Sequence, residues 1–135
     1  MILQDYTVID LEMTGLHPKN DAMLEVGAAK IRNGEVTDTM DIFVNPGRKI
    51  APEITELTGI TDEMVKEGLS PAEAFHKTAE FIGDDILVGH NIKSSDLHYI
   101  TTAANRAGVA FENKFFDTYL YAKTLKEQQG WENVK

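Results

Sequence analysis

The sequence predicts an α/β domain whose mixed sheet has three antiparallel strands first and parallel strands afterwards, with flanking helices. Two observations carry this prediction. Three segments rich in β-branched and apolar residues fill most of residues 3–44, and beyond residue 70 helical patterns alternate with short apolar runs. The length of 135 residues fits a single domain with its own core, so residues 1–135 are interpreted as one domain.

The first strand is expected over residues 3–11, where apolar side chains occur at both parities, as in a central strand. Two further strands, residues 24–32 and 36–44, flank Asn33-Gly34, a pair that readily takes the positive φ angles of a tight hairpin turn. These three segments should therefore form the antiparallel part of the sheet.

Residues 51–65 carry two short helical turns interrupted by Gly59. The clearest helix begins after Ser70, the expected N-cap, with Glu73 completing a capping box and Gly83 ending the helix. Its apolar face consists of Phe75, Ala79 and Ile82. The helix should therefore pack on the sheet through that face.

The second half of the chain continues the alternation. A short buried strand is expected within residues 85–91, then a helix over residues 95–106 that Gly108 ends. The inward-facing positions of that helix are Leu97, Ile100 and Ala104. Another strand at residues 114–118 and a helix over residues 118–128 follow.

The composition and net charge limit which metal ligands and binding partners the chain can have. With no cysteine in the sequence, a metal ion must be held by oxygen or imidazole ligands. The net charge of −9 opposes non-specific attraction to a phosphate backbone, so a nucleic-acid ligand would need a bridging cation. No apolar run approaches the roughly 18 residues of a membrane span, and no signal-like start is present, which predicts a cytoplasmic protein without a membrane partner.

Two acids, Asp10 and Glu12, stand at the end of the first strand. Residues two apart share a face of a strand, roughly 7 Å apart at the α carbons. Two charges about 6 Å apart at an effective dielectric near 20 cost on the order of 3 kcal/mol, which a divalent cation would reverse. Magnesium or manganese is the expected cation because both prefer oxygen ligands. A solvated strand end is the alternative interpretation.

A third acid, Asp96, lies in the first turn of the expected helix 95–106, directly after a buried strand. Open α/β sheets usually bind ligands at the carboxyl ends of their strands, which makes Asp96 a candidate partner of Asp10 and Glu12. The helix macrodipole favours an acid in the first turn whether or not it has a function, so a structural role stays open.

Three ordered motifs, "DLEMTGL", "LTGIT" and "LVGHNIKSSD", together resemble the 3′–5′ exonucleases of the DEDD superfamily, over residues 5–122. The similarity is greatest to the proofreading ε subunit of DNA polymerase III and to PolC-type exonuclease domains. "IDLEMTGL" alone is also similar to oligoribonuclease. The resemblance implies a ribonuclease H-like fold and a site with two divalent ions, Mg or Mn.

The resemblance also implies residue roles. Asp10 would bridge two metal ions, Glu12 would bind the hydrolytic ion, and Asp96 would help to hold the second. The terminal nucleotide would be contacted by one short segment: Thr14, Gly15 and Leu16. A second pair would support the turn before Asp96: His90 and Asn91. Ordinary turn and packing roles stay open for these five residues.

The third motif of this superfamily is absent. Neither His-x-x-x-x-Asp nor an unassigned Tyr-x-x-x-Asp occurs, so the domain is expected to be C-terminally incomplete and weakly active or inactive. Asp117 is interpreted as the cap of the following helix, and Ser95 and Met13 depart from the common pattern. Self-association through exposed apolar surface near Trp131 is expected.

The leading functional hypothesis is a metal-dependent exonuclease domain that acts on single-stranded 3′ ends, of DNA rather than RNA, in polymerase proofreading or repair. A DNA polymerase is the expected protein partner. Two alternatives stay open. One is a non-catalytic module that binds a polymerase or nucleic acid, and the other is an oligoribonuclease-like enzyme that trims RNA.

Overall fold

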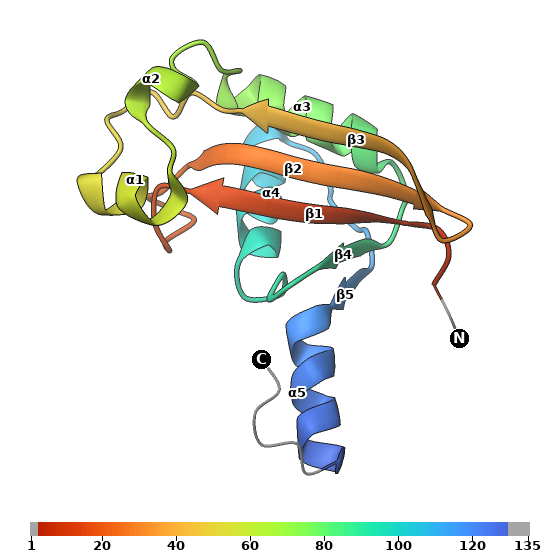
Figure 1. Cartoon of the computed structure of the whole chain (residues 1–135). Coiled ribbons are helices and arrows are strands. Elements are labelled where there is room, and N and C mark those ends of the chain that lie inside the picture. Colours follow the sequence, from red (N-terminus) through yellow and green to blue (C-terminus); the bar gives the residue numbers. More distant parts are fainter. Residues whose placement is uncertain (1–2, 130–135) are drawn as a thin grey trace.

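The structure, a computed structural model, describes residues 3–129, with side chains described for residues 3–124 (Figure 1). The strands are β1 (Tyr6–Met13), β2 (Met23–Arg32), β3 (Glu35–Phe43), β4 (Leu87–Gly89) and β5 (Phe115–Asp117). The helices are α1 (Pro52–Thr58), α2 (Asp62–Val65), α3 (Pro71–Ile82), α4 (Asp96–Ala107) and α5 (Thr118–Gln129). Trp131, near which the sequence predicts self-association, lies outside the described residues.

The five strands form one mixed sheet in the order β3-β2-β1-β4-β5. β2 pairs antiparallel with both β1 and β3, whereas β1 pairs parallel with β4, and β4 with β5. Asn33 and Gly34 turn the β2–β3 hairpin with φ angles of 53° and 77°. The predicted mixed sheet and the predicted hairpin are therefore both confirmed, and β1 is the central strand.

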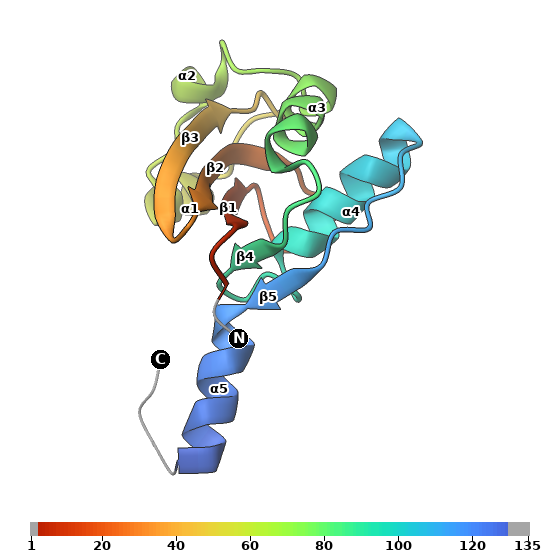
Figure 2. The same ribbon diagram turned by 90° about the vertical axis from the view of Figure 1, so that its right-hand side faces the viewer.

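The helices cover the sheet where their sequence patterns predict. α3 begins with the expected capping box, in which Ser70 accepts from the backbone N–H of Glu73 and Glu73 accepts from that of Ser70. α3 and α4 lie together on one side of the sheet (Figure 2). Their buried side chains join the main core with residues of β1, β2 and β4: Ile9, Leu11, Val26, Phe75, Ile82, Leu87, Ile100 and Ala104.

A second, smaller core lies where β1 ends, beside α1 and α2 (Figure 1). It consists of Leu24, Ile50, Ile60 and Val65, with Phe43 and Ile54 packed against it. Gly59 separates the two short helices with a φ of 78°, as the sequence predicts. This arrangement leaves the carboxyl end of β1 between the two groups of helices.

α5 projects away from the sheet below β5 in both views (Figures 1 and 2). Its first turn carries side chains that are largely exposed: Tyr119, Leu120 and Tyr121. Within residues 3–129, none of the helices combines the length and the apolar composition needed to cross a bilayer.

Candidate active site

The carboxyl end of β1 presents Asp10 and Glu12 on the face that points away from the main core. The alternate residues Ile9 and Leu11 are buried, while Asp10 is exposed and Glu12 is half-buried. Partial burial, and then the charge of Asp10, raise the pKa of the Glu12 carboxyl above its usual value. The two acids therefore share one face and repel each other.

Asp96, the first residue of α4, comes to the same place from a distant part of the chain. Because β4 runs parallel to β1, the turn after β4 delivers α4 to the edge of the sheet where β1 ends. The buried Asp96 accepts a hydrogen bond at Oδ2 from the backbone N–H of Leu11, at 3.2 Å. Leu11 stands between Asp10 and Glu12 in the sequence, so the structure brings the three acids together.

The charges of these acids act on one another. Burial raises the pKa of Asp96 to about 6, and the charges of Asp10 and Glu12 add to that effect. The backbone N–H of Leu11 and the side chain of Ser95 oppose it by donating to the ionised carboxylate. The site therefore holds negative charge at a free-energy cost in the absence of a cation.

Two more acids, Glu25 and Asp41, extend the cluster, and the sequence analysis missed them. Glu25 is directly opposite Glu12 in the β1–β2 register, and Asp41 is opposite Gly27, which in turn is opposite Asp10. Residues opposite each other in a sheet point to the same face. A shared hydrogen bond with Asp41 raises the pKa of Glu25 to about 7, and burial and the neighbouring acids contribute. Strand alternation offered a signal, but the register needed to use it is not visible in the sequence.

The donor chemistry of the site fits a hard divalent cation. Asp10, Glu12 and Asp96 offer oxygen ligands, which magnesium and manganese prefer. A cation would also remove the repulsion that raises the pKa values of Glu12 and Asp96. Among the side chains that the structure describes, no three His, Asp or Glu residues already stand close enough to enclose an ion. Asp10, Glu12 and Asp96 are therefore candidate ligands by their chemistry and their shared location.

The segment after β1 forms a braced loop next to the acids. Thr14 donates through Oγ1 to Asp21 at 2.9 Å and accepts from the backbone N–H of Ala22 at 2.9 Å. A Cβ atom at Gly15 would lie 2.4 Å from Oδ2 of Asp21, so glycine allows the close approach. Leu16 is 84% exposed at the tip. The loop therefore presents a free apolar side chain on a fixed backbone.

Tyr99 of α4 braces the same loop from the core side. Its hydroxyl donates to the carbonyl oxygen of Gly15 at 2.5 Å, and the side chain is buried. Burial, together with the charge of Asp21, raises the pKa of Tyr99 to about 12, which keeps the hydroxyl protonated as a donor. The sequence analysis missed Tyr99, because its helical position alone predicts only a core residue.

The turn before Asp96 is held by Asp117. Asp117 accepts from the backbone N–H groups of Asn91 and Lys93, at 2.9 and 3.0 Å, and from those of Tyr119 and Leu120. Burial opposes ionisation of Asp117, but these four donors lower its pKa below the usual value. The predicted capping role of Asp117 is thereby confirmed. Its hydrogen bonds to the turn before Asp96 were not predicted from the sequence.

His90 and Asn91 take part in this same turn. The Nδ1 atom of His90 is 3.1 Å from Oγ1 of Thr118, and its ring meets that of Tyr119 edge to face. Asn91 adopts a φ of 57° and accepts at Oδ1 from the hydroxyl of Ser94. The contacts of His90 link the end of β4 to the start of α5, and those of Asn91 lie within the turn itself.

Comparison with known proteins identifies relatives of this chain. Residues 7–133 match the family RNase_T, described as exonuclease. The chain is 40% identical over 121 residues to a PolC-type DNA polymerase III of Caldanaerobacter subterraneus, covering 90% of this chain and 9% of the relative. It is 41% identical over 122 residues to that of Listeria monocytogenes, covering 89% of this chain and 8% of the relative. The predicted resemblance to DEDD exonucleases is confirmed.

Solved structures of exonuclease I share the fold. An apo structure matches with a TM-score of 0.84 at 14% identity, covering 97% of this chain and 32% of that one. The E. coli enzyme in complex with a 5cy-dA13 oligonucleotide matches with a TM-score of 0.83 at 15% identity, covering 96% and 31%. The predicted ribonuclease H-like fold is thereby confirmed. The chain spans less than a tenth of the polymerases and about a third of the exonuclease I chains.

Proposed function

This chain belongs to the RNase_T exonuclease family, and on that premise we propose that it is a metal-dependent 3′–5′ exonuclease domain acting on single-stranded DNA. The observation that carries the proposal is the hydrogen bond from the backbone N–H of Leu11 to Asp96, which ties a distant acid to the strand bearing Asp10 and Glu12. Acids that lie together repel one another, so their location at one strand end disfavours a purely structural role.

In this proposal Asp10, Glu12 and Asp96 would hold the divalent cations, Mg or Mn. When bound, two ions supply charge to both the attacking and the leaving oxygen of an in-line displacement. The residues of the chain fix the geometry: Asp96 is oriented by the N–H of Leu11, and Tyr99 holds the carbonyl of Gly15. Asp96 is thus oriented by a backbone contact, and the loop that follows β1 is held by Tyr99.

The braced loop would contact the terminal nucleotide. The exposed side chain of Leu16 can pack against a base. Thr14 and Gly15 would hold the backbone of the loop in place, because Thr14 donates to Asp21 and Gly15 leaves room for that side chain. His90 and Asn91 would act indirectly, by keeping the turn that orients Asp96. DNA is the proposed substrate, and a DNA polymerase the proposed partner in the cytoplasm, because the relatives are PolC-type DNA polymerases.

A second candidate function is a non-catalytic module that binds single-stranded nucleic acid or a polymerase through the same fold. Within residues 1–135, neither His-x-x-x-x-Asp nor an unassigned Tyr-x-x-x-Asp occurs, and those patterns carry the general base and the fourth acid of the DEDD enzymes that this chain resembles. A general base typically contributes 10²- to 10⁴-fold to the rate. Activity on DNA therefore decides between the two proposals.

One experiment separates these functions. A 5′-labelled single-stranded DNA is incubated with the protein and Mg²⁺ or Mn²⁺, with EDTA as the blank, and binding of Mn²⁺ alone is measured by calorimetry. We expect a weak ladder of shortened products with either ion, because the residues that would supply the general base are not among the 135. Asp10→Asn should abolish both the ladder and Mn²⁺ binding, whereas Asp38→Asn, on an exposed position of β3, should change neither.

The alternatives give different results. DNA binding without shortening would replace the exonuclease proposal by the binding module. Faster shortening of a short RNA than of DNA of the same sequence would indicate an RNA-trimming enzyme. Mn²⁺ binding that is unchanged in Asp10→Asn would contradict the assignment of the metal site, whatever the activity.

A further inference from the structure

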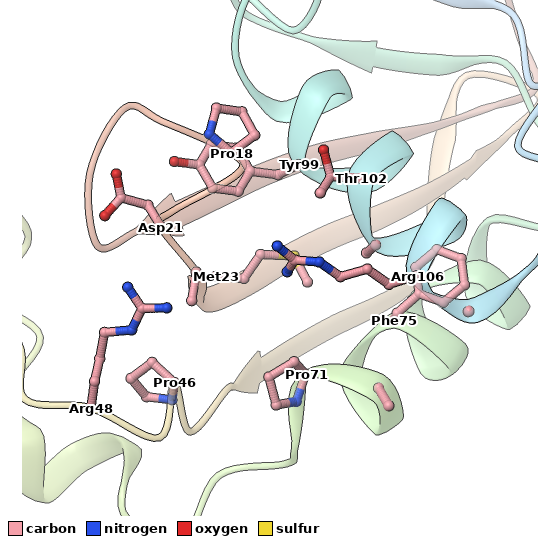
Figure 3. A pocket seen from close by; sticks show the side chains of 14 residues that line it. Pro18, Asp21, Met23, Pro46, Arg48, Pro71, Phe75, Tyr99, Thr102 and Arg106 are labelled. Carbon is pink, nitrogen blue, oxygen red and sulfur yellow. The ribbon is translucent and has the colours of Figure 1, made fainter.

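A hollow of about 300 Å³ lies beside the braced loop (Figure 3). It is bounded by α3, α4, the loop between β1 and β2, and the loop that follows β3. Asp10, Glu12 and Asp96 do not line it. The hollow is therefore a second candidate site, distinct from the proposed active site, which it meets only through the loop.

The floor and walls of the hollow are mainly apolar. Met23, Phe75 and Tyr99 are buried beneath it and belong to the main core, so the floor is fixed by packing. Three prolines stand around its edge in Figure 3: Pro18, Pro46 and Pro71. A preformed apolar surface of this kind gains free energy by burying an apolar group without first reorganising.

Two arginines, Arg48 and Arg106, extend into this hollow from opposite sides (Figure 3). Arg48 donates to the carbonyl oxygen of Asn20 at 2.5 Å, and Arg106 donates to that of Lys19 at 3.3 Å. Among the side chains that the structure describes, the one ion pair is formed elsewhere, between Arg32 and Asp85. Each guanidinium has five N–H donors, so both arginines keep donors for an incoming anion.

One acid, Asp21, stands in the lining with the two arginines, and it forms no described ion pair with either of them. The two carboxylate oxygens of Asp21 accept from the hydroxyl of Thr14 and from the backbone N–H of His17, at 2.9 and 3.0 Å. In a chain with a net charge of −9, a hollow with two guanidinium groups over an apolar floor differs sharply from the rest of the surface. Its charge complements carboxylates, which arginine binds in a bidentate manner.

We propose that this hollow binds an acidic peptide segment of a partner protein, with one or two apolar side chains on the floor and carboxylates on Arg48 and Arg106. The volume of about 300 Å³ is at the lower end of ligand pockets, which suits side chains rather than a large ligand. A nucleic-acid strand fits less well, because the rings of Phe75 and Tyr99 are buried and offer no free face for stacking. This proposal does not depend on hydrolysis.

The test uses ¹⁵N-labelled protein and the capped peptide Glu-Leu-Phe-Asp-Glu in EDTA, so that metal binding plays no part. We expect saturable amide shifts at Ala22, Thr102 and Ala103, around the hollow. The double variant Arg48→Ala, Arg106→Ala should weaken binding at least about tenfold, since a hydrogen bond to a charged group contributes about 1.5–3 kcal/mol. Lysine at both positions should restore part of the affinity.

Ala103→Trp provides a second variant that leaves both arginines in place and fills the hollow, and it should also abolish binding. Lys123→Ala, an exposed cation on α5, is the control and should bind like the unaltered protein. A Lys-Leu-Phe-Lys-Lys peptide and a Glu-Ala-Ala-Asp-Glu peptide should each bind weakly, because one lacks the acids and the other the apolar side chains. Amide spectra of every variant establish that it is folded.

Several results would overturn the proposal. Shifts that lie away from the hollow, or binding that survives both the double arginine variant and Ala103→Trp, would place the peptide elsewhere. The same shifts with an oligothymidylate, lost in the arginine variants, would make the hollow a nucleic-acid site. No shift with the acidic peptide at millimolar concentration would also refute it.

Discussion

Carboxyl groups at the two ends of β1 have pKa values shifted in opposite directions. At the amino end, Asp85 accepts from the hydroxyl of Thr7 at 2.7 Å and from Arg32 at 2.9 Å. Burial opposes its ionisation, but these two donors and the charge of Arg32 lower the pKa of Asp85 below the usual value. At the carboxyl end, burial raises the pKa values of Glu12 and Asp96. The charge of Asp10 raises both further.

This difference separates a structural acid from candidate functional ones. The Asp85 carboxylate is satisfied by groups of the chain itself, so its ionised form stabilises the fold. Of the acids around Asp10, Asp96 accepts from one backbone N–H and from the Ser95 side chain, and none forms a described ion pair, so their ionised forms cost free energy. Perturbed acids without internal partners are typical of functional sites.

The largest expected effect is on the rate of DNA hydrolysis. Asp96→Asn keeps the size of the side chain but removes the charge of a proposed metal ligand. We expect a loss of at least about 10²-fold in kcat on single-stranded DNA, because removing even the partners of metal ligands typically costs 10- to 100-fold. The control is Asp62→Asn. Asp62 is also the first residue of its helix and also accepts a distant backbone N–H, that of Ile50 at 2.8 Å. Equal losses in both variants would show that Asp96 acts only through the fold.

The next effect is on the pH dependence of stability in the metal-free protein. The pKa of Asp96 is about 6 when folded and about 4 when unfolded, so the folded state binds more protons between these values. Stability should therefore fall as the pH rises through this window, by up to about 3 kcal/mol. Urea unfolding in EDTA measures it, and Asp96→Asn should remove this part of the slope. If the free energy of unfolding depends on pH in the same way in both proteins, the raised pKa of Asp96 is contradicted.

Asp85 should behave in the opposite sense. Asp85→Asn removes the charge that faces Arg32 and one of two strong acceptors, so we expect a loss of about 1–2 kcal/mol in the free energy of unfolding at neutral pH. Because its pKa is lowered, the contribution of Asp85 should disappear as the pH falls below about 4. Asp84→Asn, at the exposed neighbouring position, is the control in the same urea titrations. A gain in stability would contradict this assignment.

The smallest effect concerns Glu25. Its pKa of about 7 means that the pair with Asp41 shares a proton near neutral pH. Glu25→Gln keeps a donor for Asp41 and removes one negative charge, so the metal-free protein should gain less than about 1 kcal/mol above pH 7, an amount limited by solvent screening. Thermal unfolding in EDTA checks it. A clear loss of stability would show that the Glu25–Asp41 contact is structural.

Much of the fold follows from local signals in the sequence. Ser70 and Glu73 specify the start of α3, and Asn33 and Gly34 specify the hairpin, because capping and turn geometry depend on a few adjacent residues. The placement of Asp10 and Glu12 on one face follows from strand alternation alone. These features need no knowledge of tertiary contacts, and the structure confirms them.

The features that the sequence did not predict depend on register and on contacts between distant segments. Glu25 joins the acids because β2 pairs with β1 in one register, and a shift of one residue would turn it to the opposite face. The bond from Tyr99 to Gly15 and the pair of Arg32 with Asp85 join residues 84 and 53 positions apart. Neither has a local pattern that distinguishes it from an ordinary core tyrosine or surface pair.

The hydrogen bond between Leu11 and Asp96 joins the first strand to a helix from the second half of the chain. During synthesis, a ribosome-bound chain that has made only its first three strands carries Asp10 and Glu12 but lacks the third acid. The three acids lie at one end of the sheet only after α4 docks beside β1. At the proposed site, cation binding would therefore depend on the docking of a helix from the second half of the chain.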